Sequence, residues 1–172
     1  MIHANLAVAH DLLSIIKCIS EKLYKNNIRL DKKMESFKRE DTYDIGVKLA
    51  EASKPGDVYC LYGDLGTGKT VLSQGFGCGL GIKEPISSPT FTILKEYHEG
   101  RLPFYHFDVY RISDSDEMDE IGYYDKIDGD GVCLIEWAEI IEDILPSHYK
   151  KVSITKDVEK GFDYRKIIIE EI

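Results

Sequence analysis

The chain has 172 residues, of which 43 % are apolar, so it is long and apolar enough for one globular domain with its own core. Asp and Glu outnumber Lys and Arg by 31 to 22, which gives a net charge of −9. Because binding to a nucleic-acid backbone needs clustered basic side chains, this balance argues against DNA as a partner and favours proteins or small ligands.

Residues 1–33 form the first predicted unit, an N-terminal helical extension. Five apolar side chains recur at helical spacing and share one face: Leu12, Ile15, Ile16, Ile19 and Leu23. This pattern predicts an amphipathic helix, and we expect the extension to have no catalytic role. The stretch has no basic leader, and His10 and Asp11 interrupt its apolar run, so we expect no signal peptide.

The cysteines and the hydropathy pattern bear on the cellular compartment. None of the four cysteines has a second Cys or a His at zinc-ligand spacing; they are Cys18, Cys60, Cys78 and Cys133. No apolar run approaches the roughly 20 residues that a membrane-spanning helix needs. We therefore expect a cytoplasmic protein with reduced, mostly buried thiols and no membrane partner.

Residues 34–172 form the second predicted unit, in which strands alternate with helices. The expected elements are a helix capped by Asp41 or Thr42, a strand at 58–62, a helix from about 70, a hairpin of 93–97 and 104–110, an acidic helix at 113–121, a strand at 132–137, a short helix ending near 146, and strands at 152–155 and 164–170. This alternation predicts an α/β sandwich of three layers around a mainly parallel, mixed sheet.

The segment GDLGTGKT, residues 63–70, matches GxxxxGK[ST] at every fixed position, with an apolar strand before it and a helix after it. Glycines let backbone N–H groups turn toward phosphate oxygens, and a helix N-terminus adds its positive dipole end. Lys69 is expected to reach the β- and γ-phosphates of ATP, and the Thr70 hydroxyl to bind Mg²⁺. This motif predicts that residues 34–172 form a P-loop NTPase-like domain. The residues expected to bind the nucleotide are Asp64, Leu65, Gly66, Thr67, Gly68, Lys69, Thr70 and Val71.

The helix after this loop carries Gly75, Gly77 and Gly79, each of which costs about 1 kcal/mol relative to Ala in a helix interior. We expect this helix to be short or to pack very closely against another element.

Two acids end apolar strands and are candidates for the metal and for catalysis together with Lys69. Asp108 closes FYHFDVY, and Glu136 closes VCLIEW. Either carboxylate could bind Mg²⁺ directly or through water, or orient an attacking water. His106, two residues before Asp108, is a candidate general base or a packed side chain that supports a neighbour. The pattern leaves both choices open.

Several protein classes compete for this motif. The GTPase base-reading motif [NT]KxD is missing, because Thr155, Lys156 and Asp157 lack the spacer, so a regulatory GTPase is not expected. The turn DGDG at 128–131 does not align with a calcium-binding loop. Three classes remain: an ATPase that drives a protein assembly, a small-metabolite P-loop kinase, and a nucleotide-gated binding module with negligible hydrolysis.

From about Ser36 to Ile172 the chain resembles the TsaE (YjeE) family, small bacterial ATPases of tRNA threonylcarbamoyladenosine biosynthesis. The matching pieces come in the family's order: PGDVYCLYGDLGTGKT, SSPTFTILKEY, HFDVYR, EMDEIGYYD and LIEWAE. The resemblance implies a cytoplasmic ATPase that is weak alone and works with the TsaB–TsaD pair. That pair transfers a threonylcarbamoyl group to adenosine 37 of tRNA, so tRNA would be contacted only indirectly.

The resemblance also implies roles for particular residues. Thr70 and Glu136 would be associated with Mg²⁺, and Asp108 would be needed for hydrolysis. Trp137 would lie by the nucleotide, and Thr42 would lie toward the adenine.

The SPTFT segment, residues 88–92, would be a switch-like loop near the γ-phosphate. Residues 1–33 fall outside the family pattern.

Overall fold

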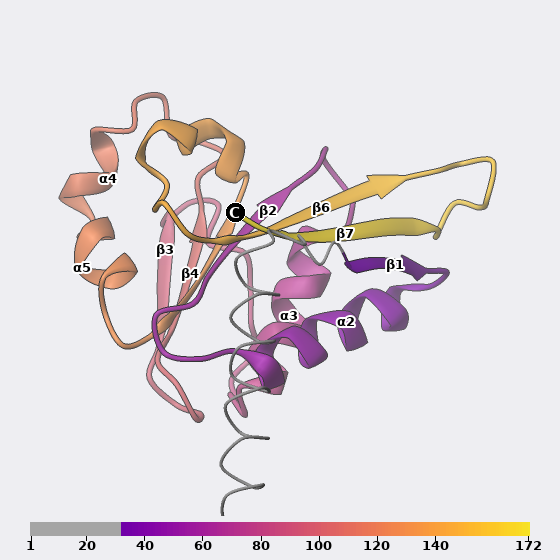
Figure 1. Ribbon diagram of the computed structural model, residues 1–172, viewed down its shortest axis with the longest axis horizontal. Helices are drawn as coiled ribbons and strands as arrows, with labels where there is room; N and C mark the ends of the chain where they lie inside the picture. Colours follow the sequence, from indigo (N-terminus) through magenta and orange to yellow (C-terminus); the bar gives the residue numbers. More distant parts are fainter. Residues whose placement is uncertain (1–31) are drawn as a thin grey trace, which may run out of the picture. The chain divides into compact units, whose positions relative to one another are not determined.

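The computed structural model describes residues 32–172 (Figure 1). The amphipathic helix predicted around residues 12–23 lies outside the described residues. Lys32 and Lys33, at the end of the expected extension, form the start of strand β1 (Lys32–Ser36). None of the helices between residues 32 and 172 is long and apolar enough to cross a membrane.

One seven-stranded sheet organises this part of the chain, in the order β1-β7-β6-β2-β5-β4-β3. The remaining strands are β2 (Val58–Tyr62), β3 (Leu94–Tyr97), β4 (Phe104–Asp108), β5 (Val132–Glu136), β6 (Lys150–Lys156) and β7 (Arg165–Glu171). The four central strands, β6, β2, β5 and β4, run parallel. The outer pairings, β1 with β7, β7 with β6 and β3 with β4, are antiparallel. The predicted mixed sheet with a parallel centre is confirmed.

Helices cover both faces of the sheet, which gives the predicted three layers (Figure 1). They are α2 (Arg39–Ala52) and α3 (Lys69–Gly79) on one face, and α4 (Glu117–Glu120), α5 (Tyr123–Ile127) and the 3-10 helix η1 (Ala138–Ile144) on the other. Strand β2 shows the alternation that a doubly covered strand needs. Tyr59 and Leu61 pack into the α2–α3 cluster, whereas Val58 and Cys60 pack into the other.

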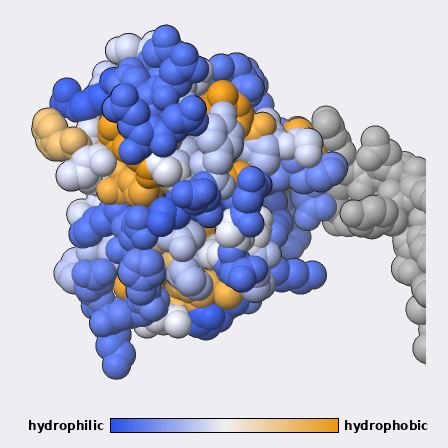
Figure 2. Space-filling model, turned by 90° about the vertical axis from the view of Figure 1, so that its left-hand side faces the viewer, coloured by the Kyte–Doolittle hydropathy of each residue, from blue (hydrophilic) through white to orange (hydrophobic). Residues whose placement is uncertain are grey.

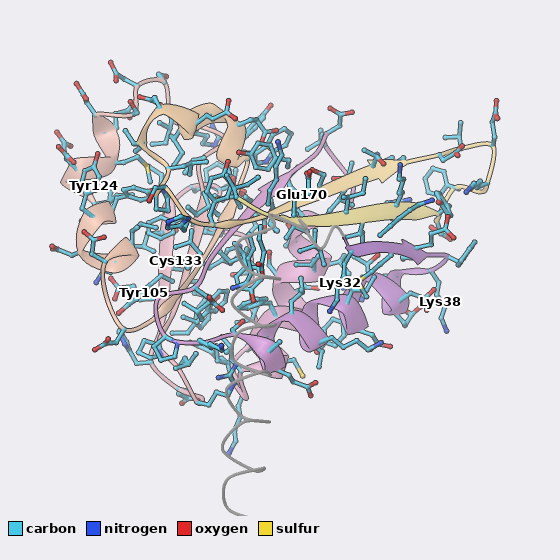
Figure 3. All side chains as sticks on the ribbon, viewed as in Figure 1. Lys32, Lys38, Tyr105, Tyr124, Cys133 and Glu170 are labelled. Atoms are coloured by element: carbon cyan, nitrogen blue, oxygen red, sulfur yellow. The ribbon has the colours of Figure 1, made fainter. Side chains whose placement is uncertain are left out.

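The cluster under α4 and α5 is well covered. Cys133, on β5, lies in it, and its Sγ atom is 3.3 Å from the carbonyl oxygen of Lys126 on α5 (Figure 3). Burial raises the pKa of the Cys133 thiol to about 12, as expected for an inert core cysteine. Figure 2 shows that the surface on this side is mostly hydrophilic, with small separate hydrophobic areas. Among the described cysteines, Cys60 is also buried and Cys78 is exposed.

Helices α2 and α3 approach each other closely through glycines, as predicted for the helix after the loop. A Cβ atom on Gly75 would lie 2.0 Å from the carbonyl oxygen of Tyr43. A Cβ on Gly46 would lie 2.2 Å from the carbonyl oxygen of Leu72. Only hydrogen at these positions allows the two backbones to touch. The contact seats the N-terminus of α3 against α2, and this places the glycine-rich loop.

Some helix boundaries differ from the prediction. Capping of α2 by Asp41 or Thr42 is wrong, because α2 begins at Arg39 and both side chains lie in its first turn. Asp41 reaches back from inside the helix and accepts a hydrogen bond from the N–H of Phe37, which satisfies a free amide near the helix start. The acidic helix is only the four residues of α4.

Two elements went unpredicted, the edge strand β1 and the short helix α5.

Candidate functional site

A cavity of about 490 Å³ opens at the carboxyl ends of β2, β4 and β5. Its wall is made by the start of α2, the glycine-rich loop with the first residues of α3, the segment 88–90, the ends of β4 and β5, and the region of residues 163–165. In open α/β sheets, ligands bind in the crevice outside the carboxyl ends of the parallel strands. The position and size of the cavity therefore make it the candidate ligand site.

The glycine-rich loop has three positions whose backbone conformation or close contacts favour glycine. Gly63 has φ 143°, and a Cβ there would lie 2.4 Å from the carbonyl oxygen of Ile154 on β6. Gly66 and Gly68 have φ 72° and 105°, in the left-handed region. The Thr67 hydroxyl donates to the carbonyl oxygen of Asp64 at 2.9 Å, which holds the loop in its turn.

The N-terminus of α3 faces this loop without a side-chain cap. The amides of Lys69, Thr70 and Val71 make no hydrogen bond with any residue of 32–172. The first amides of a helix have no intrahelical acceptor, and together with the helix dipole they form a site for an anion. The three residues also line the cavity. The loop and helix start can therefore hold phosphate oxygens.

Lys69 is an ammonium group held in a largely buried position, with only 5 % of the residue exposed. Its Nζ donates to the carbonyl oxygens of Gly63 and, at 3.1 Å, of Asp64. The same Nζ lies 3.5 Å from the centroid of the Trp137 ring. Burial lowers the pKa of Lys69, and the negative charges of Glu136 and other acids offset part of that effect. The site therefore holds a cation whose solvation is incomplete, which an anionic ligand would complete.

Glu136, at the end of β5, is buried and has three side-chain hydrogen-bond partners. The Thr70 hydroxyl donates to its Oε2 at 3.1 Å, and the Ser73 hydroxyl donates to its Oε1 at 2.8 Å. The Nε2 atom of His106 lies 2.9 Å from the same Oε1. Because the Thr70 proton points to the carboxylate, the lone pairs of the Thr70 oxygen stay free for another ligand.

Asp108, at the end of β4, is also buried and holds a different set of groups. Its Oδ2 accepts hydrogen bonds from the hydroxyls of Ser88 and, at 2.7 Å, of Thr90. Its Oδ1 accepts one from the N–H of Tyr110 at 3.2 Å. Asp108 therefore ties the segment 88–90 to the end of β4. It pairs in the sheet with Glu136, so the two carboxylates end adjacent parallel strands.

Thr42 and Trp137 lie on the cavity wall. The Thr42 hydroxyl shares a 2.7 Å hydrogen bond with the hydroxyl of Ser36. Trp137 has φ 65°, an uncommon conformation for a bulky residue, and its ring lies 4.8 Å from that of Tyr110. A strained aromatic residue at a strand end, beside a buried ammonium, is typical of a functional site.

The structure brings nearly all the predicted site residues to this one cavity. Those that line it are Thr42, Leu65, Gly66, Thr67, Gly68, Lys69, Thr70, Val71, Asp108, Glu136 and Trp137. Asp64 does not line it and contributes its backbone carbonyl oxygen to Lys69. His106 is fully buried, is bonded to Glu136 and does not line the cavity, which matches the packed alternative and not the general base.

Sequence reasoning missed five residues of the site. Arg39, Tyr110, Asp163 and Arg165 line the cavity, and Ser73 bonds to Glu136. Ser73 follows Thr70 by three residues and Arg39 precedes Thr42 by three, so helical spacing could have indicated both. Asp163 and Arg165 carried no local signal. The return of the chain from β6 to the antiparallel β7 places them at the cavity. Nε of Arg165 donates to the carbonyl oxygen of Thr67 at 2.8 Å.

The donor set of the cavity suits a small hard cation. Mg²⁺ prefers oxygen ligands and is usually held by one or two carboxylates together with substrate phosphates. The Thr70 hydroxyl, Glu136 and Asp108 are the oxygen groups that could hold it here. Across residues 32–172, no three His, Cys, Asp or Glu side chains gather into a metal-binding cluster.

Comparison with known proteins identifies relatives of most of the described domain. Residues 36–167 match the family model of "Threonylcarbamoyl adenosine biosynthesis protein TsaE". The chain is similar to the Bacillus subtilis tRNA threonylcarbamoyladenosine biosynthesis protein TsaE, with 46 % identity over 78 % of this chain and 82 % of the relative. Its similarity to the Treponema pallidum protein of the same name is 42 % identity over 67 % of this chain and 84 % of that one.

A solved structure shows the same fold. The crystal structure of Bacillus subtilis YdiB superposes with a TM-score of 0.70 at 40 % sequence identity. The match covers 84 % of this chain and 87 % of that one. The shared architecture supports the P-loop NTPase-like fold.

Proposed function

The chain belongs to the TsaE family of tRNA threonylcarbamoyladenosine biosynthesis proteins, and from this membership we propose that it binds ATP with Mg²⁺ in the described cavity and hydrolyses it weakly on its own. A TsaB–TsaD complex raises that turnover. The hydrolysis in turn supports threonylcarbamoyl transfer to adenosine 37 of tRNA by that complex.

The observation that carries the proposal is the convergence of cationic and amide donors on one wall of the cavity. Lys69 and the free amides at the start of α3 face the same space as the loop glycines. A triphosphate bears several negative charges, and such donors are the groups that hold it. The ammonium of Lys69, which donates to the carbonyl oxygens of Gly63 and Asp64, would hold phosphate oxygens of a bound ATP.

Thr70 and Glu136 are the proposed holders of Mg²⁺, with Asp108 as a further candidate. Glu136 accepts a hydrogen bond from the Thr70 hydroxyl, so the lone pairs of that hydroxyl would be free to hold the cation. When bound, Mg²⁺ neutralises charge on the phosphate oxygens. Asp108 is the proposed group that orients the attacking water, because it is a hydrogen-bond acceptor on the cavity wall. Thr42 and Trp137 complete the nucleotide site.

The charge of the chain suits action through a protein complex. A net charge of −9 disfavours strong direct binding to tRNA, so the tRNA contact is indirect. We place the protein in the cytoplasm with its tRNA-modifying partners.

The test is ATP hydrolysis by the purified chain with Mg²⁺ and no other acceptor, with and without the TsaB–TsaD pair. The expected result is that the chain by itself hydrolyses ATP slowly or not at all and that the pair raises the rate. A Lys69→Met variant should hydrolyse no ATP in either condition. A hydrolysis rate that is the same with and without the pair would overturn the assigned partner. Strict dependence on a small-molecule acceptor would favour a metabolite kinase. Tight ATP binding without turnover, even with the pair, would favour a nucleotide-gated binding module.

A further inference from the structure

His106 is a fully buried histidine that the proposed mechanism does not yet use. It lies on β4, where its ring stacks on that of Phe104 at 5.7 Å between centroids and 13° between planes. Its Nε2 atom lies 2.9 Å from Oε1 of Glu136. Its Nδ1 atom has no hydrogen-bond partner among residues 32–172. The ring is therefore held by packing on one side and by a single polar contact on the other.

This arrangement selects one tautomer of the imidazole. A proton on Nδ1 would be a buried donor without an acceptor, which is unfavourable. A proton on Nε2 has the Glu136 carboxylate as its acceptor, and a hydrogen bond to a charged group is among the stronger kinds. His106 thus donates through Nε2–H to Oε1 of Glu136.

The hydrogen bond from His106 decides how the carboxylate of Glu136 is turned. Ser73 also reaches Oε1, but its single proton is shared with the carbonyl oxygen of Lys69, 3.0 Å away. His106 is therefore the donor that holds Oε1 without competition. With Oε1 directed to His106, Oε2 is left for the hydroxyl of Thr70.

Resting on the proposed function, we infer that His106 is a positioning residue for the cation site. It fixes the orientation of Glu136 so that Oε2 and the Thr70 hydroxyl together face a divalent cation. Groups that orient a metal ligand typically contribute 10- to 100-fold to metal affinity. His106 does not line the cavity, so it acts through Glu136 and does not exchange protons with a ligand.

The test uses His106→Leu, which removes the donor, and His106→Gln, whose amide nitrogen can replace Nε2. His98→Leu is the matched control, because His98 is an exposed histidine on the turn that follows β3 and does not line the cavity. Trp137 is the only tryptophan in the chain and lies 3.5 Å from Nζ of Lys69, so its fluorescence reports ATP binding. The dissociation constant for ATP is measured in Mg²⁺ and in EDTA for each variant.

His106→Leu should reduce the Mg²⁺-dependent gain in ATP affinity by about 10- to 100-fold while leaving the affinity in EDTA unchanged. His106→Gln and His98→Leu should keep most of that gain. A full Mg²⁺ gain in His106→Leu would overturn the inference. So would an equal loss of affinity in EDTA and in Mg²⁺, because that result indicates a purely structural role. Melting temperatures without ligand identify any unfolded variant.

A second measurement uses the wild-type chain without nucleotide. Long-range ¹H–¹⁵N spectra of histidine-labelled protein should show the His106 proton on Nε2. A proton on Nδ1 would overturn the inference even if no variant folds. If the wild-type chain gives no response to ATP under any condition, the proposed function fails, and the cation role of His106 fails with it whatever the tautomer is.

Discussion

Replacing Lys69 with Met should have opposite effects on ATP binding and on stability. Only 5 % of Lys69 is exposed, and its Nζ is shared between two loop carbonyl oxygens and the Trp137 ring. These contacts do not make up for lost hydration, since burial lowers the pKa of the ammonium despite the nearby acids. Burying this charge therefore lowers the free energy of unfolding of the chain. Met has a similar length and is apolar, so its burial carries no such cost.

The loss in binding follows from the contacts that the ammonium would make. A hydrogen bond to a charged group contributes about 1.5–3 kcal/mol. Contacts to the β- and γ-phosphates together would contribute about 3–6 kcal/mol, so the dissociation constant should rise about 10²- to 10⁴-fold. The same substitution should raise the melting temperature of the ligand-free chain, by about 2–4 °C for each kcal/mol gained.

The sign of the pH dependence is also determined. The folded-state pKa of Lys69 lies below its ordinary value of 10.5, so between the two pKa values the unfolded chain binds more protons. Stability of the wild-type chain therefore rises with pH through that window because of this group. Urea unfolding of Lys69→Met should lack this part of the rise.

Lys156→Met is the matched control for these measurements. Nζ of Lys156 donates to the carbonyl oxygen of Leu65 on the same loop at 3.0 Å, but Lys156 does not line the cavity. Titration calorimetry and thermal melting of both variants give the comparison. Near-normal ATP affinity in Lys69→Met, or an equal loss in the control, would refute the assigned role of Lys69. A lower melting temperature in Lys69→Met would refute the account of its burial.

Three further substitutions test the packing and the carboxylates. Gly75→Ala should destabilise the chain by about 1–3 kcal/mol in urea unfolding, because the new methyl group meets the Tyr43 carbonyl oxygen at 2.0 Å. Cys78→Ala, on the exposed side of α3, should leave the stability unchanged. An unchanged unfolding midpoint in Gly75→Ala would contradict the close helix contact. Asp108→Ala should keep much of the ATP affinity and lose phosphate release, so normal turnover would remove Asp108 from the mechanism. Glu136→Ala should keep its ATP affinity in EDTA but lose the Mg²⁺-dependent gain in affinity together with phosphate release, and normal hydrolysis by it would disprove the metal assignment.

The glycine-rich loop shows how much a contiguous segment determines by itself. Strand, loop and helix follow one another within residues 58–79, and the left-handed conformations of Gly66 and Gly68 depend on local sterics. Three glycines in one helix likewise indicated a short helix or a close contact with another element. The alternation of apolar runs with turns was enough for the α/β class and for most strands.

Other features depended on strand order, which no local pattern contains. The sequence marked Asp108 and Glu136 equally, as acids that end apolar strands. In the sheet, β5 lies next to β2 whereas β4 lies one strand farther away. Glu136 therefore bonds to Thr70, and Asp108 bonds to the segment 88–90.

The same distinction explains the residues that were missed. Strand β1 carries exposed charged side chains, so its sequence shows no apolar strand pattern. It forms a strand because it pairs with β7. Arg165 reaches the glycine-rich loop across 98 residues of sequence because β7 returns antiparallel beside β6. The sequence by itself determined the loop, the helix glycines and the identity of the acids, since short-range sterics and periodicity act within a few residues. Tertiary structure decided which acid meets Thr70, which side chain His106 contacts and how Arg165 enters the site, because these contacts arise only when the whole sheet packs.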